Sequence, residues 1–561
     1  MTAEGSPPRP SRARALAWVV LPLLVLALHG APSIDYLLPG FESHLGENYQ
    51  PLRALKFYSS LGGAYHKYGP MPNWVLLPVY GPSLAVWWAT GSFAGPSGDF
   101  PYGLRDALGQ LSFLIRAGRI EFMVLGLGLY AFLLLSLRFV TPRPAAAAAA
   151  FLACVGTSYT AAHFLANTRP DGLSYAFLAA SLGVYVRILD RGATPARVVW
   201  LSLLAVFAIS SKELAGPAYL LPYLGLGLRL HRQAATGPVG RARFRRLVGA
   251  SLASGVGAYL LLNVVYDPAV WARRMSHWLG GTGTSADVWR AGGAAALTPG
   301  VRAVEAFEGF LDTLGPGGLW LVPVALAALV CLGRRHRTLL LLPFASLTLF
   351  GLVPLGFPGD RFYTMATVTL VPPVASGLDA LCARARTGPA RASLWGFAIL
   401  ALGANAWFAS WAWLELEGRP ERTIERALAS EDPPFDGSLN VLSVYPRVPG
   451  KSRLEVAGQR LDPRSIQELL DAAPASLPDR IYASEGTLRF LEDARGAPAR
   501  AELFASQGLE FPRWRGVEAL GYRLRETVRT PTPAWFPFDW MPAVRWRAER
   551  SPMRVYERIL P

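Results

Sequence analysis

Residues 120–143 read IEFMVLGLGLYAFLLLSLRFVTPR, an apolar run that is closed by Arg138 and Arg143. A helix needs about 20 mainly apolar residues to cross the hydrocarbon core of a bilayer, and this run is close to that length. Similar runs recur along the chain, and arginine-rich loops follow every second one. The pattern predicts a mainly α-helical protein that crosses a membrane many times.

The same criterion places about eleven transmembrane helices along the chain. We expect them within a polytopic domain over residues 15–413, at 15–31, 120–137, 144–162, 173–188, 198–210, 214–230, 247–265, 319–332, 339–355, 362–381 and 393–413. A short tail, 1–14, precedes the first helix. That helix lacks an obvious cleavage site of small residues, so we expect it to be retained.

The arginine clusters predict the orientation of these helices. Clusters follow the second, fourth, sixth, eighth and tenth expected crossings and precede the first. Positively charged loops stay on the cytoplasmic side of a membrane. We therefore expect a multi-pass protein of the cell membrane with a cytoplasmic N-terminus and an extracytoplasmic C-terminal region.

One further apolar stretch, 71–90, would place every later arginine cluster on the opposite side of the membrane if it crossed the membrane. Prolines interrupt regular helix, and tryptophans favour the headgroup layer. The stretch contains both, as Pro72, Pro78, Pro82, Trp74, Trp87 and Trp88. We interpret it as an interfacial or re-entrant segment of a long first outer loop, 32–119.

The formal net charge of +16 would indicate a nucleic-acid partner in a soluble protein. Here the arginines of the expected cytoplasmic loops account for most of the excess, so we expect membrane lipids and no nucleic acid. The three cysteines, Cys154, Cys331 and Cys382, lie in apolar segments without metal-ligand spacing. Neither a zinc site nor a disulfide framework is indicated.

The sequence becomes charged and proline-punctuated beyond the last expected crossing. Helical periodicity is present at 422–430, 464–472 and 485–494, and strand-like runs are present at 439–445 and 480–483. We expect a small extracytoplasmic α/β domain over residues 415–561, which is long enough to form its own core.

Charged residues also gather in the segments assigned to the outer face. The first loop carries Asp35, Glu42, Glu47 and Lys67, and the shorter outer segments are HFLANTRPDG (163–172), SSKELAG (210–216) and FPGDRFY (357–363). Single charges near the ends of membrane helices usually snorkel or cap. Carboxylates and cations that converge at one face favour a functional site instead.

These segments resemble the GT-C class of integral membrane glycosyltransferases, which includes protein O-mannosyltransferases and lipid A aminoarabinose transferases. The resemblance covers the chain to about residue 413 and rests on the order of several motifs. They are HKYGPMPNW (66–74), Arg119, TRPDG (168–172), Lys212 and DRFY (360–363). It implies transfer of a sugar from a polyprenyl-phosphate carrier to a glycan, lipid or protein acceptor.

The resemblance also implies a general base in the first outer loop, normally the aspartate of an Asp-Glu pair. The best match is HLGENYQ (44–50), where Gly46 replaces that aspartate and Glu47 keeps the second acid. We favour Glu47 as the base. Asp35 or Glu42 would supply it under a shifted alignment, and a chain that has lost transfer activity is the third reading.

Displacing a phosphate from an anomeric carbon requires cations to neutralise the leaving group. Lys67 matches the family's phosphate-binding lysine, and Arg169, Lys212 and Arg361 are further candidates. Asp171 resembles a second family acid, although an ion pair with Arg169 is about as plausible. Single-phosphate chemistry of this kind indicates neither a metal nor a cofactor.

Two alternatives belong to other classes. A lipid-linked sugar flippase or transporter would usually show paired internal repeats and polar groups on both faces of a central cavity. A transfer-inactive scaffold would use the outer domain to bind a partner. We further expect His66 and His163 to be structural hydrogen-bonding residues, and Trp74, Tyr65 and Tyr68 to anchor at the interface more readily than to stack on sugars.

Overall fold

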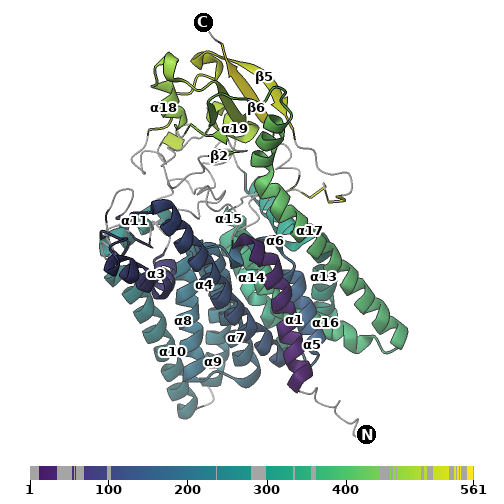
Figure 1. Ribbon diagram of the computed structural model, residues 1–561. Coiled ribbons are helices and arrows are strands. Elements are labelled where there is room, and N and C mark those ends of the chain that lie inside the picture. Colours follow the sequence, from purple (N-terminus) through teal and green to yellow (C-terminus); the bar gives the residue numbers. More distant parts are fainter. Residues whose placement is uncertain are drawn as a thin grey trace.

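The computed structural model describes residues 12–34, 54–55, 57–58, 69–95, 97, 103–234, 237–279, 298–332, 335–355, 362–442, 455–456, 459–462, 464–493, 498, 500–501, 510–529, 536–538, 540–541, 544 and 552–559. These residues form a bundle of long helices with a small sheet beyond one end (Figure 1). The N-terminus lies at the opposite end of the bundle from the sheet (Figure 1).

Helix is present at every place where the sequence predicts a crossing. The bundle comprises α1 (Arg12–Gly30), η1 (Ala31–Ser33), α3 (Met71–Ala89), α4 (Ala107–Ser136), η2 (Leu137–Phe139), α5 (Pro144–Phe151), η3 (Leu152–Gly156), α6 (Tyr159–Leu165), α7 (Pro170–Arg191), α8 (Pro195–Ser211), η4 (Glu213–Tyr219), α9 (Leu220–Ala234), α10 (Pro238–Tyr259), η5 (Leu260–Val265), α11 (Pro268–Leu279), α13 (Pro299–Leu332), η7 (Arg335–Leu341), α14 (Leu342–Leu347), η8 (Thr348–Leu352), α15 (Val353–Leu355), α16 (Thr364–Arg384) and α17 (Gly388–Ala429).

Within the described residues, seven helices are long and apolar enough to cross a membrane. The number rises to eight if Pro144–Gly156 and Tyr159–Leu165, which meet at a bend of 78°, form one span. The protein is therefore a multi-pass membrane protein of mainly helical fold. The figure of about eleven crossings stays a prediction, because Pro195–Ser211 and Thr338–Leu352 are apolar but shorter.

Two helices form the centre of the bundle. The membrane-length windows of α7 and α16 are 89% and 94% buried, whereas that of α10 is only 6% buried. Apolar side chains on this outer helix are exposed, among them Leu252 and Val256, which fits a surface that faces lipid. The central helices therefore set the positions of whatever lies at their ends.

The longest central element, α13, is bent at Gly315, whose φ of 69° lies in the left-handed region that glycine tolerates. The amide of Asn405 on α17 holds this bend. Its oxygen accepts hydrogen bonds from Gly317 N at 2.6 Å and Gly318 N at 3.1 Å, and its nitrogen donates to Leu314 O at 2.9 Å. The backbone groups freed by the bend are thus satisfied inside the bundle.

Arginines at the end of α7 and just ahead of α5 lie at one end of the bundle. Arg187 donates to Ser136 Oγ at 3.1 Å, and the guanidinium of Arg191 lies 4.4 Å from the centre of the Phe139 ring. Both contacts join the end of α7 to the end of α4. On the same side Arg143, ahead of α5, pairs with Asp379 near the end of α16. These contacts bring the ends of α4, α7 and α16 and the start of α5 to one side of the bundle, and the side of the membrane on which this end lies stays a prediction.

The stretch predicted to be interfacial forms α3, which is not among the membrane-length apolar helices of the described residues. Its Trp87 ring packs edge-on against Phe113 of α4, with ring centres 5.6 Å apart. Figure 1 places α3 and α11 toward the end of the bundle that faces the sheet. The interfacial assignment itself stays a prediction.

The last helix, α17, does not end at Trp413 but continues to Ala429, so the predicted helix at 422–430 is its final part. Beyond it a four-stranded sheet has the order β1 (Leu439–Val441), β4 (Arg480–Ser484), β6 (Met553–Arg558) and β5 (Tyr522–Val528). The β1–β4 pair is parallel, and the other two pairs are antiparallel. The remaining elements are β2 (Glu455–Val456), β3 (Gln459–Arg460), α18 (Ile466–Leu470), η10 (Pro474–Ser476), α19 (Glu485–Glu492) and η11 (Glu518–Leu520).

The sequence predicts β1, β4, α18 and α19 at nearly the observed places. It does not predict β6, nor β5, YRLRETV, although Tyr522 and Leu524 alternate there with Arg523 and Arg525. Buried Ile466, Ile481, Leu488 and Tyr522 share one apolar core in this region. A separate domain over 415–561 remains our interpretation of these elements.

Candidate functional site

Asp171 occupies the first turn of α7. Pro170 precedes it at the start of the helix, where a missing N–H has no cost. The positive end of the helix dipole favours a carboxylate at this position. The residue is fully buried, with 0% of its surface exposed. A buried carboxylate near a helix end requires partners, and the structure supplies cations from two directions.

The first cation is Lys212, where α8 ends. Its backbone leaves the helix with φ −151° and ψ 120°, while its N–H still donates to Ala208 O at 2.9 Å. The side chain turns inward, and its ammonium group contacts Asp171 Oδ1. The second cation is Arg169, whose Nε lies 3.5 Å from Asp171 Oδ2. The ion pair that was one alternative for Asp171 is therefore present, and Lys212 joins it.

The three charged groups form a buried trio, because the side chains of Arg169, Asp171 and Lys212 are 9%, 0% and 3% exposed. Two cations therefore contact one buried carboxylate. The trio brings an oriented carboxylate and two cations to one place.

Two other segments reach Lys212 or the nearby Ser210 through their described residues. The ammonium of Lys212 lies 4.5 Å from the centre of the Phe362 ring. Gly69 lies so close to Ser210 that a Cβ at this position would overlap the Ser210 carbonyl oxygen. Phe362 directly follows Arg361 in sequence, and Gly69 lies two residues after Lys67.

A third contact joins the end of α1 to the middle of α4. Arg119 is only 3% exposed and donates from Nη1 to the carbonyl oxygen of Ile34 at 3.0 Å. A Cβ added to the neighbouring Gly118 would lie 2.8 Å from Thr168 Cγ2, just before the trio. Ile34 is the residue directly before Asp35. The end of α1, the middle of α4, the end of α8 and the start of α7 therefore meet at one place.

The structure describes Arg169, Asp171 and Lys212 and brings all three together. The other predicted site residues, Asp35, Glu47, Lys67 and Arg361, lie outside the described residues, as does Glu42. Their assignments stay predictions.

A second buried ionic network adjoins the trio and is absent from the sequence-based prediction. Arg274 of α11 pairs with Glu213 at 3.1 Å and donates to Asn263 Oδ1 at 2.9 Å. Asn263 in turn donates to Ser210 Oγ at 2.6 Å. Arg274 is 3% exposed, but in sequence it reads as one of many arginines beside aromatic residues. The sequence gives one hint of this network, the Lys212-Glu213 dipeptide. A buried carboxylate beside a buried lysine needs a cation of its own, but the dipeptide does not indicate which one.

His163 and Trp74, both in segments assigned to the outer face from sequence, contact neighbouring protein side chains. The Nε2 atom of His163 lies 3.4 Å from Asn167 Nδ2, and its ring centre lies 4.9 Å from that of Phe164. Trp74 packs edge-on against Phe57 and Tyr266, at 5.0 and 5.6 Å between ring centres. Within the described ranges no three His, Cys, Asp or Glu side chains gather in an arrangement that could hold a metal ion.

No protein-family model matches the sequence, and no curated protein is similar enough to match it. Similar folds do occur among solved structures. ArnT from Cupriavidus metallidurans in the apo state is 15% identical, with 86% of this chain and 95% of that chain covered and a TM-score of 0.46. Its structure bound to undecaprenyl phosphate gives 13% identity, 98% and 99% coverage and a TM-score of 0.45.

Two other glycosyltransferases are similar. The Archaeoglobus fulgidus oligosaccharyltransferase is 12% identical over 88% of this chain and 73% of its own, with a TM-score of 0.43. The arabinofuranosyltransferase AftD from Mycobacteria is 13% identical, with 99% of this chain and 40% of that chain covered and a TM-score of 0.36.

Proposed function

We propose that the protein is a membrane glycosyltransferase that moves a sugar from a polyprenyl-phosphate carrier to an acceptor hydroxyl. The observation that carries the proposal is the buried trio of Arg169, Asp171 and Lys212, in which two cations contact one carboxylate where α8 ends and α7 begins. Gly69 approaches Ser210, and Phe362 lies against Lys212. These two contacts support our assignment of Lys67 and Arg361, which lie two and one residues earlier in sequence, to the same site.

The proposed reaction uses these groups in complementary ways. The acceptor oxygen bonds to the anomeric carbon while the bond from that carbon to the carrier phosphate oxygen breaks. A carboxylate accepts the hydroxyl proton, and cations neutralise the charge that develops on the departing phosphate. We assign the base to Glu47, with Asp35 and Glu42 as the alternatives left open by the sequence.

The phosphate is assigned to Lys67 and Arg361, with Arg169 and Lys212 behind them. Because both of the latter already contact Asp171, their contribution is a fixed positive field rather than a free side chain. Asp171 holds these two cations in place and is available to orient a hydroxyl of the sugar or acceptor. The acceptor is a glycan, a lipid or a protein.

We assign the site to the extracytoplasmic face, because the arginine clusters occupy the other end of the bundle. The C-terminal sheet lies on the site's side (Figure 1). A reporter that fluoresces only in the cytoplasm, fused after Pro561, should stay dark, while the same reporter inserted after Arg386 should be bright. The reverse result would place the site in the cytoplasm.

The test of function is transfer of radiolabelled sugar from polyprenyl-phosphate donors in proteoliposomes. Asp171→Asn should lose transfer, and Asp190→Asn should keep it. Asp190 is a matched control, because it lies at the other end of α7 and is 46% exposed. Movement of the labelled lipid between leaflets without transfer would favour the flippase alternative, and the absence of both would favour the scaffold.

A further inference from the structure

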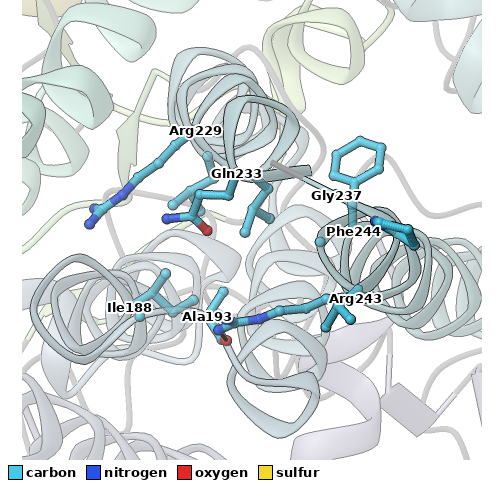
Figure 2. Close-up of a pocket in the computed structure, with 13 residues that line it drawn as sticks. Ile188, Ala193, Arg229, Gln233, Gly237, Arg243 and Phe244 are labelled. Atoms are coloured by element: carbon cyan, nitrogen blue, oxygen red, sulfur yellow. Dashed lines mark hydrogen bonds between the residues drawn. The ribbon is translucent and has the colours of Figure 1, made fainter. Parts of the chain in front are cut away.

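Figure 2 shows a pocket of about 650 Å³ at the end of α7 opposite to the one that carries Asp171. It forms where α7 and α9 end and α10 begins. Three segments line it: Ile188, Gly192 and Ala193; Leu226, Arg229, Leu230 and Gln233; and Gly237, Pro238, Val239, Gly240, Arg243 and Phe244. The proposed transfer reaction makes no use of this pocket.

The charge of the pocket is of one sign. None of the thirteen described residues that line it is acidic, whereas Arg229 and Arg243 both contribute guanidinium groups. Among the residues that the structure describes, no carboxylate forms an ion pair with either arginine. Arg243 Nη2 donates to Ala193 O at 3.0 Å, and Figure 2 shows this side chain reaching across from α10 toward Ala193. Two uncompensated cations at one cavity attract an anion.

The backbone adds to this attraction. Gly237, Pro238, Val239 and Gly240 form the start of α10, a helix of 22 residues. The first N–H groups of a helix have no partner within it, and the positive end of the helix dipole lies there. A phosphate group accepts hydrogen bonds from such N–H groups and from guanidinium groups alike.

The apolar side chains of the pocket favour a lipid over a soluble anion as its ligand. Leu226, Leu230 and Phe244 line the pocket beside its arginines, and Val239 at its edge is 84% exposed. The pocket also lies where α7 and α10, two membrane-length helices, reach the end of the bundle. We infer that it binds the headgroup phosphate of an anionic phospholipid, with the lipid's acyl chains along the apolar side chains.

The experiment uses the full-length protein purified in detergent and titrated with short-chain phosphatidylglycerol or phosphatidylcholine, with bound lipid counted by native mass spectrometry. Phosphatidylglycerol should be retained and phosphatidylcholine should not. The double variant Arg229→Gln/Arg243→Gln should bind phosphatidylglycerol about tenfold more weakly, the loss of about one charge-assisted hydrogen bond. Arg243→Lys in combination with native Arg229 keeps the charge and should retain most of the affinity.

The matched control is Arg232→Gln/Arg245→Gln. It removes the same charge from the same two helices, at positions that are exposed like Arg229 and Arg243 but lie outside the pocket lining, and it should leave binding unchanged. Equal weakening in both double variants, or equal retention of the two lipids, would overturn the inference. Displacement of phosphatidylglycerol by equimolar inorganic phosphate would reassign the pocket to a soluble phosphate. Unfolding temperatures measured without lipid verify that every variant is folded.

Discussion

The carboxylate of Asp171 and the ammonium of Lys212 contact each other across 41 residues of sequence, at the buried ends of two neighbouring helices. Removing one member of such a pair leaves the other charged and without its main counterion. Asp171→Asn should therefore destabilise the protein by about 3–5 kcal/mol, as is usual for broken buried pairs. Thermal unfolding in detergent, followed by tryptophan fluorescence, measures this loss.

The double variant Asp171→Asn/Lys212→Gln is the internal control. Its destabilisation should be smaller than the sum of the two single variants, because no full charge of the pair remains buried. Additive losses would mean that the two groups do not depend on each other in the folded protein.

The general base is tested by comparing Glu47→Gln with Asp35→Asn in the same vesicles. Glutamine keeps the shape of Glu47 but cannot accept a proton, so transfer should fall by about a hundredfold or more while donor binding persists. Asp35 is the principal rival, since Ile34 directly before it accepts the hydrogen bond of buried Arg119. Full activity of Glu47→Gln with none in Asp35→Asn would move the base to Asp35, and full activity in both would leave Glu42 or a non-enzymatic role.

The leaving-group contacts predict a loss of donor affinity. Lys67→Ala and Arg361→Ala should each weaken binding of the polyprenyl-phosphate sugar by about tenfold or more, because a charge-assisted contact contributes about 1.5–3 kcal/mol. Arg302→Ala is the control, since its exposed guanidinium donates to Pro354 O rather than toward the trio. Unchanged affinity in both test variants would remove Lys67 and Arg361 from the site.

Much of the architecture follows from local sequence, but the pairing within the site does not. Apolar length and charge register predict helices because each depends on neighbouring residues. The Asp171–Lys212 contact depends on how two helices pack, and nothing near either residue specifies the other. The position of Arg274 likewise depends on packing rather than on local sequence. Its guanidinium is buried because α11 brings it against Asn263 of η5 and Glu213 of η4.

The close approach of Gly69 to Ser210 gives a prediction that leaves every charge intact. In Gly69→Ala the added methyl group would overlap the Ser210 carbonyl oxygen and displace the segment that follows Lys67. Transfer should fall at low donor concentration and recover partly at saturation. Gly81→Ala is the matched control, because its methyl group would meet only the flexible Leu77 side chain at 3.6 Å. Equal activity of the two variants at every donor concentration would show that this contact does not position the donor site.

The C-terminal sheet carries a pH-dependent contact of its own. Asp479 Oδ2 accepts hydrogen bonds from the backbone N–H and the hydroxyl of Ser438, each at 2.7 Å, and these bonds lower the pKa of the Asp479 carboxyl. A carboxyl whose pKa is lower in the folded than in the unfolded protein stabilises the fold above its ordinary pKa, and that stabilisation is lost as the pH falls through the folded value. Unfolding temperatures measured between about pH 3 and 7 should therefore fall less steeply toward acid in Asp479→Asn than in the native protein. Ser438→Ala removes the hydroxyl donor but keeps the N–H, so the fall of its unfolding temperature toward acid should lie between those of the other two proteins. If the unfolding temperature of Asp479→Asn fell as steeply as that of the native protein, this contact would not couple folding to pH.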